Sequence, residues 1–564
     1  MGSPFQITLD IADVCRCVKE IATTLNGFSE DLDTIEVSFR RELGRTESCE
    51  RVVSQPRFGK QSLLEIVGDL QRQSILESFT KVIEHWKKFN TIITACRADP
   101  ASASAVIALV RRSSSWKIRK RTSWMLGGKE KATKVLATVE QLNQNLSQDI
   151  TWTITHFGGN STIELEGLEA SDDAQIVGIP STVTLQKIER DQSFADKNIL
   201  IPSGLLHTVD QPTVSGENLK FGKFRDAIFT LVEHRYYTQS EKSQLSLPMA
   251  LRLATFLNRT QAEGTGILQC IGMTHEPAYR RFSYIFDFSP LTGGRLISTH
   301  QGKSMSSLPK MFTLREQLKR GGPSLFQYTR FGDPEVYNPA ATRPLSSTHR
   351  VSFAASLART LSNLHVVSWL HQSIQSGNIL FTIDSSGQWC TISRPYLVGF
   401  QFARSINEYS DRYGVRKGVG PEQYIYKHPD RHHNDKREPS RPHNLLDDIY
   451  SLGVVFLEIG LGREAVELYN VIPTTFVHSV ENADDTHALW RDGKGLTAEQ
   501  IRNGFIMFAT EFLPERMGNK YASIVVACLK GDFEEGGRIG EEANVRIAFR
   551  STVVDELEKL ATRI

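Results

Sequence analysis

The chain has 564 residues, of which 40% are hydrophobic and 23% are charged, a composition typical of globular proteins. Its 66 basic and 64 acidic residues leave a net charge of +2, which excludes a chain that binds polyanions through its overall charge. The sequence has no run of about 18 apolar residues and no secretory signal at its start. Its seven cysteines are scattered, as in proteins of reducing compartments. We therefore expect a multidomain, cytoplasmic protein.

Apolar residues recur at steps of three and four through the first 150 residues, which predicts amphipathic helices. The first stripe consists of Ile11, Val14, Val18, Ile21 and Leu25. Further stripes cover residues 28–43, 63–93 and 135–150, and a small apolar segment covers 101–110. Because each helix must bury its apolar face against another, we predict an all-α bundle of about four or five helices over residues 1–150.

A strongly basic segment interrupts these helices at residues 111–134, where nine basic residues face one acid, Glu130. The residues that we single out are Arg111, Arg112, Trp116, Lys117, Arg119, Lys120, Arg121 and Trp124. Basic side chains flanked by tryptophans are typical of a site for an anionic membrane surface. A solvated helix face with two core tryptophans explains the pattern equally well. Nucleic acid is not an expected partner, because no reading motif accompanies the charge.

The pattern changes twice after the bundle. Residues 151–205 are polar, acidic and rich in Gly and Ser, which predicts a linker with a short brace. From residue 206 the pattern is mixed, with strands expected at 226–237 and in the stretches GILQCIGMTH and RRFSYIFDF. Helices dominate after residue 347. We therefore expect an α+β unit over residues 206–564, with a small β lobe followed by a large helical lobe.

Short motifs in this unit resemble those of protein kinases and occur in the same order. WLHQSIQSGNILF resembles the catalytic loop H-R-D-L-x-x-x-N through His371 and Asn378. LVGFQFAR resembles the metal-binding D-F-G segment through Phe400, and LLDDIYSLGVVFLEI resembles the long central helix of the large lobe, with Asp448 as its buried acid. The resemblance implies a bilobal protein kinase-like fold in which these four residues keep structural positions.

The positions that carry the catalytic groups in kinases hold other residue types in this sequence. Phosphoryl transfer needs a carboxylate as base, a carboxylate on Mg²⁺ and a lysine on the third strand. The matching positions hold Ser373, Gly399, and either His234 or Arg235. The paired glutamate of the next helix and the glycine-rich cover loop are absent as well. The resemblance therefore implies a pseudokinase with no catalytic residues rather than an enzyme.

Asn378 differs from the other retained residues, because it is a magnesium ligand in active kinases. We favour an interpretation in which its side chain binds the loop backbone, since the metal-binding acid is lost. ATP binding without turnover stays open. No metal site is expected elsewhere: His428 and His432 lie four residues apart, but Pro429 disfavours a regular helix there.

The N-terminal half has a resemblance of its own. RKRTSWMLGGKEKATKVLATVEQLNQNL resembles the C-terminal part of the HeLo domain of fungal cell-death and prion-inhibition proteins, and LDIADVCRCVKEIATTLNGF resembles the first helix of that domain. The plan of the whole chain is similar to that of the mixed lineage kinase domain-like family of necroptosis executioners. In those families the bundle attacks membranes after release and oligomerisation. Asp13, Arg16 and Lys19 make the first helix amphipathic here, which favours surface binding over insertion.

Three hypotheses follow. The first is a cytosolic signalling protein, recruited to the plasma membrane, whose pseudokinase restrains or triggers a membrane-targeting bundle in programmed cell death or heterokaryon incompatibility, with a homo-oligomer forming on activation. The second is a silent kinase-like scaffold that binds protein partners. The third is a divergent active kinase that uses another carboxylate, such as Asp384 or Asp287.

Overall fold

The structure is a computed structural model, and it divides the chain into two compact units, unit 1 with residues 1–184 and unit 2 with residues 185–564. The residues that the structure describes are 16, 36–55, 61–67, 69–97, 129–157, 171–180, 185, 188, 195–208, 219–225, 228–237, 247–260, 266–287, 310–321, 346–383, 395–406, 424–432, 441–472, 496–533 and 542–563.

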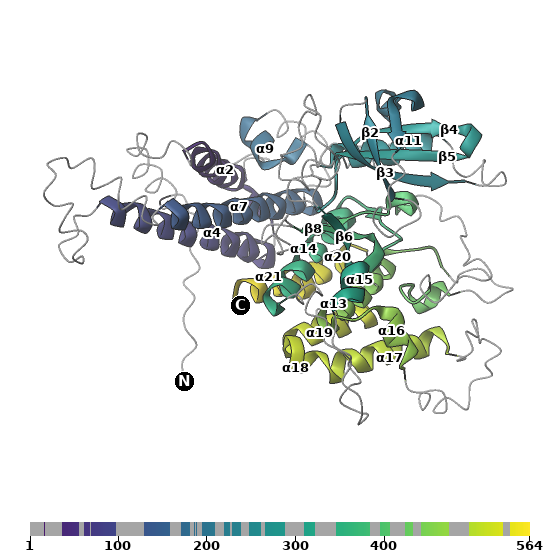
Figure 1. Cartoon of the computed structure of the whole chain (residues 1–564). Coiled ribbons are helices and arrows are strands. Elements are labelled where there is room, and N and C mark those ends of the chain that lie inside the picture. Colours follow the sequence, from purple (N-terminus) through teal and green to yellow (C-terminus); the bar gives the residue numbers. More distant parts are fainter. Residues whose placement is uncertain are drawn as a thin grey trace, which may run out of the picture. The chain divides into compact units, whose positions relative to one another are not determined.

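The described part of unit 1 is helical (Figure 1). Its helices are α2 (Glu36–Ser54), α3 (Leu63–Ile66), α4 (Asp69–Arg97), α7 (Lys129–Phe157) and α9 (Asp172–Val177). Helix α4 packs along α7, and α2 packs against both α7 and α9. The helices predicted from apolar spacing within residues 28–43, 63–93 and 135–150 are therefore confirmed wherever the structure describes those residues.

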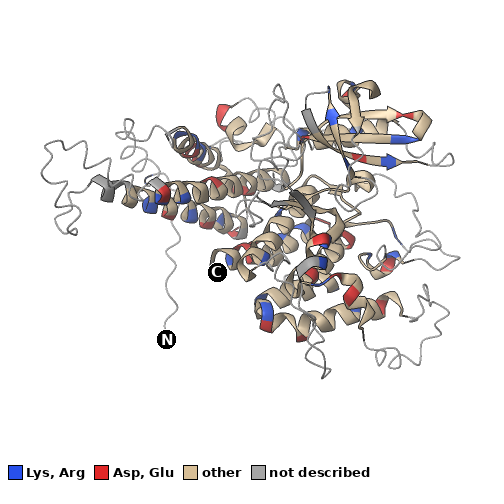
Figure 2. Cartoon of the chain, viewed as in Figure 1, with Lys and Arg blue, Asp and Glu red and all other residues tan. Residues whose placement is uncertain are grey.

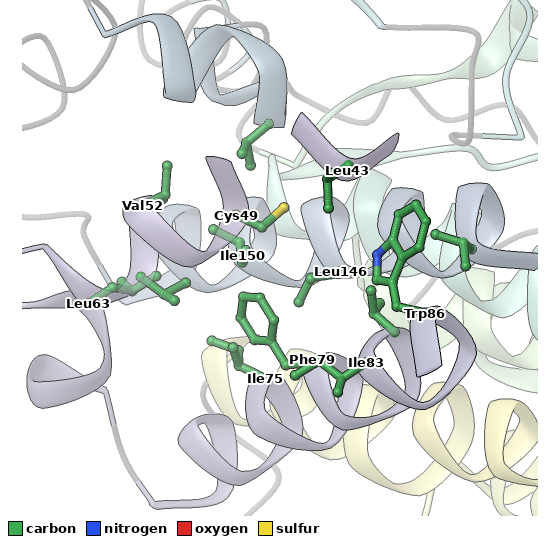
Figure 3. Packing of buried hydrophobic residues seen from close by; sticks show 14 of the residues in the cluster. Leu43, Cys49, Val52, Leu63, Ile75, Phe79, Ile83, Trp86, Leu146 and Ile150 are labelled. Atoms are coloured by element: carbon green, nitrogen blue, oxygen red, sulfur yellow. The ribbon is translucent and has the colours of Figure 1, made fainter. Parts of the chain in front are cut away.

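Aromatic rings form the centre of the unit 1 core. Phe39 of α2 stacks on Phe89 of α4 with 5.5 Å between ring centroids, and Trp86 meets these two rings edge-on at 5.6 and 5.7 Å. Leu146 and Ile150 of α7 belong to the same buried cluster (Figure 3). Edge-on and stacked ring pairs add to the favourable burial of apolar surface. The three long helices thus share one apolar interior.

A buried polar network crosses this interior between α2 and α7. Asn143 donates from Nδ2 to the backbone oxygen of Glu42 at 2.8 Å and to Glu42 Oε2 at 3.1 Å. The hydroxyl of Thr46 donates to Asn143 Oδ1 at 2.8 Å and accepts from Trp86 Nε1 at 3.1 Å. All four side chains are buried. Because sliding α2 along α7 would leave these groups unsatisfied, the network specifies the register of the two helices.

The segment predicted to be a linker, residues 151–205, is partly folded onto unit 1. Its predicted start falls inside α7, and α9 begins after Ser171, whose side chain accepts from Ala174 N at 3.1 Å. Arg51 of α2 binds the carboxylate of Asp173 at 2.8 and 3.0 Å. The apolar side of α9 joins the core of unit 1. Helix α9 has six residues, two of them acidic, and is too short to show a helical period in the sequence.

The residues predicted to contact anionic lipid lie outside the described residues, as does the predicted first helix except for Arg16. Among the described residues, no helix combines the length and the apolar character needed to cross a bilayer. In Figure 2, positions of basic (blue) and acidic (red) residues alternate along the ribbons of α4 and α7. The exposed pair Lys134 and Glu130, with 2.7 Å between nitrogen and oxygen, is one example. The membrane-binding patch therefore stays a prediction.

Unit 2 begins with an antiparallel sheet of five strands. These are β1 (Leu206–Thr208), β2 (Leu219–Phe224), β3 (Ile228–Tyr236), β4 (Cys270–Glu276) and β5 (Arg281–Asp287). They lie in the order β1-β2-β3-β5-β4, so β3 is central, and the helix α11 (Leu247–Arg259) connects β3 to β4 (Figure 1). The predicted strands at β3, β4 and β5 are confirmed.

The rest of unit 2 is mostly helical. Its strands are β6 (Lys310–Thr313), β7 (Trp369–Leu370), β8 (Ile379–Ile383), β9 (Tyr396–Leu397) and β10 (Arg404–Ser405). Its longer helices are α13 (Leu314–Gly321), α14 (Ser347–Val366), α15 (Leu445–Leu461), α17 (Ala498–Glu511), α19 (Asn519–Lys530), α20 (Glu542–Phe549) and α21 (Asp555–Arg563), and its short ones are α16 (Ala465–Asn470) and α18 (Leu513–Met517). The chain is therefore a multidomain protein of mixed α and β structure.

Helix α15 is buried along nearly its whole length. At its N-terminus, the side chain of Asn444 accepts from Leu446 N at 3.1 Å and forms a capping box with Asp447. At its C-terminus, Gly462 adopts the left-handed conformation, with φ of 68°, that ends helices. These caps fix the helix so that Asp448 lies in its first turn.

Candidate functional site

Asp448 holds the loop that follows β7. Its Oδ2 accepts from His371 N at 2.7 Å, and its Oδ1 accepts from Gln372 N at 2.9 Å. His443 Nε2 lies 3.0 Å from Oδ1, and His365 Nε2 lies 3.4 Å from Oδ2. Burial by itself raises the pKa of Asp448, but the hydrogen bonds from the two imidazoles outweigh it and hold the pKa well below its usual range. A buried, ionised aspartate thus fixes the start of the loop.

The loop itself is strained and is held from several sides. His371 is buried with its ring edge-on to Phe400 at 4.6 Å, and burial lowers the pKa of His371 to about 4. Its Nδ1 accepts from Ser373 N at 3.3 Å. Gln372 adopts a left-handed conformation with φ of 63°, and its Oε1 accepts from Arg404 Nη2 at 2.7 Å. Left-handed backbone is costly for a residue other than glycine, so these contacts maintain a conformation that the loop would not adopt alone.

Asn378 occupies the space next to Gly399. Its Nδ2 donates to Ser373 O at 2.7 Å and to Ser373 Oγ at 3.1 Å, which is the backbone contact favoured from the sequence. Gly399 has φ of 87°, and a Cβ atom added there would lie only 2.4 Å from Asn378 Nδ2. No side chain can therefore stand at residue 399 while Asn378 binds the loop.

A carboxylate from the sheet closes the site on the other side. Glu233, near the end of β3, is 2% exposed. Its Oε2 accepts from Gly399 N at 3.0 Å, and its Oε1 accepts from Gln401 N at 2.8 Å. Burial raises the pKa of Glu233 above its usual value, against the effect of these backbone hydrogen bonds. The turn at 399–401 is thus bound by an acid, in a buried environment that does not favour its charge.

The neighbours of Glu233 on β3 have other roles. Successive residues of a strand point to opposite faces, so His234 faces away from Glu233 and Arg235 shares its face. His234 Nδ1 lies 2.9 Å from the hydroxyl of Ser283, its partner across β5. Burial lowers the pKa of His234 to about 4, so its ring is neutral near pH 7. The residue of β3 that binds the 399–401 turn is therefore Glu233. The assignment of His234 or Arg235 to the kinase lysine position stays a prediction.

A second buried glutamate lies beneath the same loop. Glu458 of α15 accepts through Oε1 from the hydroxyl of Tyr426 at 2.7 Å, from that of Ser376 at 3.1 Å and from Ala465 N at 2.8 Å. The pKa of Glu458 is raised to about 7 because the effect of burial exceeds the opposing effect of its hydrogen bonds. This glutamate changes charge within the physiological pH range while in contact with the loop.

Several side chains of this arrangement bind backbone groups. Transfer of a phosphoryl group requires a base at the acceptor hydroxyl and cations at the phosphates. The residue at the base position is Ser373, whose hydroxyl accepts from Asn378. The acid that reaches the turn, Glu233, already accepts two amide hydrogen bonds, and its charge would repel phosphate. The printed contacts of Asp448, Asn378 and Glu233 at this site are therefore mainly contacts with backbone.

Every retained kinase-like position named from the sequence falls within this one site. The side chains of His371, Asn378, Phe400 and Asp448 are linked there through the contacts given above. Sequence reasoning missed Glu233, although a signal was present: a lone acid within the apolar strand sequence IFTLVEHRY is rarely buried without a partner.

The remaining candidates do not join the site. Asp287 ends β5, opposite Thr230 in the sheet register, and Asp384 lies outside the described residues. His428 accepts from Asp430 N at 3.2 Å as the cap of a short turn. In the described parts of the chain, no cluster of three or more His, Cys, Asp or Glu side chains has the geometry to hold a metal ion. No protein-family model matches the chain, and no curated protein matches it.

Proposed function

We propose that this chain is a pseudokinase-regulated signalling protein, in which unit 2 is a kinase-like module without phosphotransfer and unit 1 is the effector that it controls. The observation that carries the proposal is the contact of Glu233 with Gly399 N and Gln401 N. A kinase has a lysine on its third strand and a metal-binding aspartate in the D-F-G turn. Here the strand supplies an acid, and that acid binds the backbone of the turn.

The arrangement of unit 2 supports the kinase-like part of the proposal. The central strand β3 is followed, among the described residues, by the helix α11. In a kinase, the strand that bears the lysine is likewise followed by the helix that bears the paired glutamate. The loop after β7 and the turn at 399–401 meet at this strand, and α15 holds the loop through Asp448. The same parts in the same order, with the catalytic groups replaced, favour a bilobal pseudokinase over an unrelated α and β fold.

The first experiment measures nucleotide binding and phosphotransfer by the full chain. We expect no transfer from ATP with Mg²⁺ to a generic acceptor protein, and binding weaker than about 1 mM by calorimetry, because Glu233 repels the phosphates. Glu233→Gln, which removes this charge, should bind the nucleotide more tightly than the wild type, and Asp532→Asn, at an exposed position, should not. Metal-dependent transfer that survives in Ser373→Ala would instead establish the divergent kinase hypothesis.

The second experiment addresses the effector role of unit 1. A protease site introduced within residues 181–184 allows the two units to be separated after purification of the intact chain. We expect the cut protein to bind vesicles that contain anionic lipid, in a salt-sensitive manner, more strongly than the uncut protein. Changing Lys117, Arg119, Lys120 and Arg121 together to Glu should abolish this binding. Absence of binding by the cut protein would refute membrane targeting and leave the scaffold that binds protein partners.

A further inference from the structure

One face of α11 binds the segment that precedes the sheet of unit 2. This connecting segment comprises the described residues Leu185, Ile188 and 195–201, and it directly follows unit 1 in the sequence. The residues of α11 that contact it are Arg252, Thr255 and Arg259. They are three and four positions apart, so they lie on one side of the helix.

Each contact is made by a different kind of group. The guanidinium of Arg252, only 3% exposed, donates from Nε and Nη2 to Ile188 O at 3.0 and 2.7 Å. The hydroxyl of Thr255, which is fully buried, accepts from Asp196 N at 3.0 Å. Arg259 and the carboxylate of Asp196 form a looser, half-exposed ion pair at 3.6 Å, which contributes little. The two buried hydrogen-bonding side chains therefore carry the attachment.

The connecting segment is also fixed to the edge of the sheet. Ile201 N donates to Met273 O of β4 at 2.8 Å. The side chain of Ile201 fills the place of a side chain at Gly272, where a Cβ atom would lie 1.9 Å from Ile201 Cδ1. Glycine is required at that position because the segment lies directly against the strand. The segment is thus attached both to α11 and to β4.

Neighbouring contacts of α11, one of them made by the same Arg252, lead to the candidate site. Phe256 stacks on Trp369 with 4.0 Å between ring centroids and 16° between planes, and the guanidinium of Arg252 lies 5.9 Å from the same indole. Trp369 belongs to β7, directly before the loop held by Asp448, and it pairs with Ser405 of β10, directly after the 399–401 turn. A shift of α11 therefore displaces either its contact with the connecting segment or its contact with both halves of the site.

We infer that α11 couples the candidate site to the segment that joins the two units, with Arg252 and Thr255 as the positioning residues. The interpretation that this coupling regulates unit 1 rests on the proposed function, but the coupling itself does not depend on it. Two sites that bias the position of one packed element affect each other equally in both directions. Loosening the 399–401 turn must then loosen the connecting segment, and the reverse must hold as well.

The test is amide hydrogen exchange on the full chain, comparing Thr255→Val with Thr255→Ser. Valine keeps the shape of threonine but cannot accept from Asp196 N, whereas serine keeps the hydroxyl. We expect Thr255→Val to raise exchange about three- to tenfold both in residues 195–201 and in residues 399–405, and Thr255→Ser to leave both near the wild-type rate. Glu233→Gln, which disturbs the turn alone, should raise exchange in residues 195–201 as well.

Two results would overturn the inference. One is faster exchange confined to residues 195–201 in Thr255→Val and confined to residues 399–405 in Glu233→Gln, which would show that the two ends are independent. The other is an equal rise in α19, which would show a general loss of stability rather than coupling through α11. Neither result depends on nucleotide or vesicle binding, so failure here is distinguishable from failure of the proposed function.

Discussion

Two buried carboxylates, Asp448 and Glu233, do the same work at opposite sides of the candidate site. Each accepts two backbone amide hydrogen bonds from a turn: Asp448 from His371 and Gln372, and Glu233 from Gly399 and Gln401. Asp448 also has two imidazoles against its oxygens, and its pKa is lowered. For Glu233, the effect of burial is larger than that of its backbone hydrogen bonds, so its pKa is raised.

The difference shows how the surroundings of a buried charge decide its contribution to stability. An acid with enough donors is held ionised and stabilises the fold at neutral pH, whereas an acid with too few is destabilised by its own charge. Asp448 therefore fixes the helical side of the site firmly. On the sheet side, ionisation of Glu233 adds little stability to its contact with the turn. The weaker of the two contacts is the natural place for the site to open.

The largest effect is expected from Asp448→Asn. The amide cannot accept from four N–H groups and presents its own donors to them, so we expect the free energy of unfolding of unit 2 to fall by about 3–5 kcal/mol. Denaturant unfolding followed by circular dichroism measures this loss. Asp532→Asn, at an exposed position, is the control and should change little. A loss below about 1 kcal/mol would contradict the assignment of Asp448 as the firm contact.

Glu458 offers a third carboxylate with which to sharpen the comparison. Because the pKa of Glu458 is raised to about 7, its folded state binds a proton more readily than the unfolded state does. Its contribution to stability is therefore complete below the usual glutamate pKa and is lost as the pH rises towards 7. We expect the wild type to lose about 3 kcal/mol relative to Glu458→Gln between pH 4.5 and 8. Urea unfolding midpoints of both proteins across this range test the prediction, and parallel curves would refute it.

Gly399→Ala tests whether the side chain of Asn378 excludes any side chain, a metal-binding acid included, from residue 399. The added Cβ atom meets Asn378 Nδ2, and the backbone has φ of 87°, so we expect a loss of about 2 kcal/mol in the free energy of unfolding. The double variant with Asn378→Gly should lose less free energy of unfolding than the two single variants lose together. Without the Asn378 side chain, the Cβ atom of the new alanine has nothing to clash with. Strict additivity in this cycle would mean that the two residues do not compete for space.

The smallest effect is expected from Glu233→Gln, and its pH dependence has the opposite sign to that of Asp448. Glutamine keeps one acceptor, so the loss of stability is about 1 kcal/mol at low pH. Because the pKa of Glu233 is raised, the wild type loses stability as the pH rises through that value, and the difference from the variant shrinks. Because the pKa of Asp448 is lowered, the stability it confers is instead lost as the pH falls. Differences that move the same way with pH in the two variants would refute the comparison.

Much of the framework could be predicted from the sequence because the local signals are strong. The apolar spacing of α4 and α7 and the strand-like composition of β3 and β5 each predicted the right element. The helix α15 and the loop after β7 were expected from a resemblance of their motifs, in order along the chain, to those of kinases. The extent of unit 1 could not, since α9 has a single helical turn of apolar contacts and its attachment depends on Arg51, which is distant in the sequence.

The sequence by itself determined that Ser373, Gly399 and Arg235 stand at the positions that the resemblance to kinases assigns to a base, a metal-binding acid and a lysine. Only the tertiary structure decided what replaced them. It showed that Glu233 accepts hydrogen bonds from the turn, whereas the adjacent His234 lies on the opposite face of β3 because successive side chains of a strand alternate between faces. It also separated two similar acids by their partners: the pKa of Asp448 is lowered by His365 and His443, which lie on either side of it in space but apart along the chain. The sign of a pKa shift depends on burial and on neighbours, and neither is local in sequence.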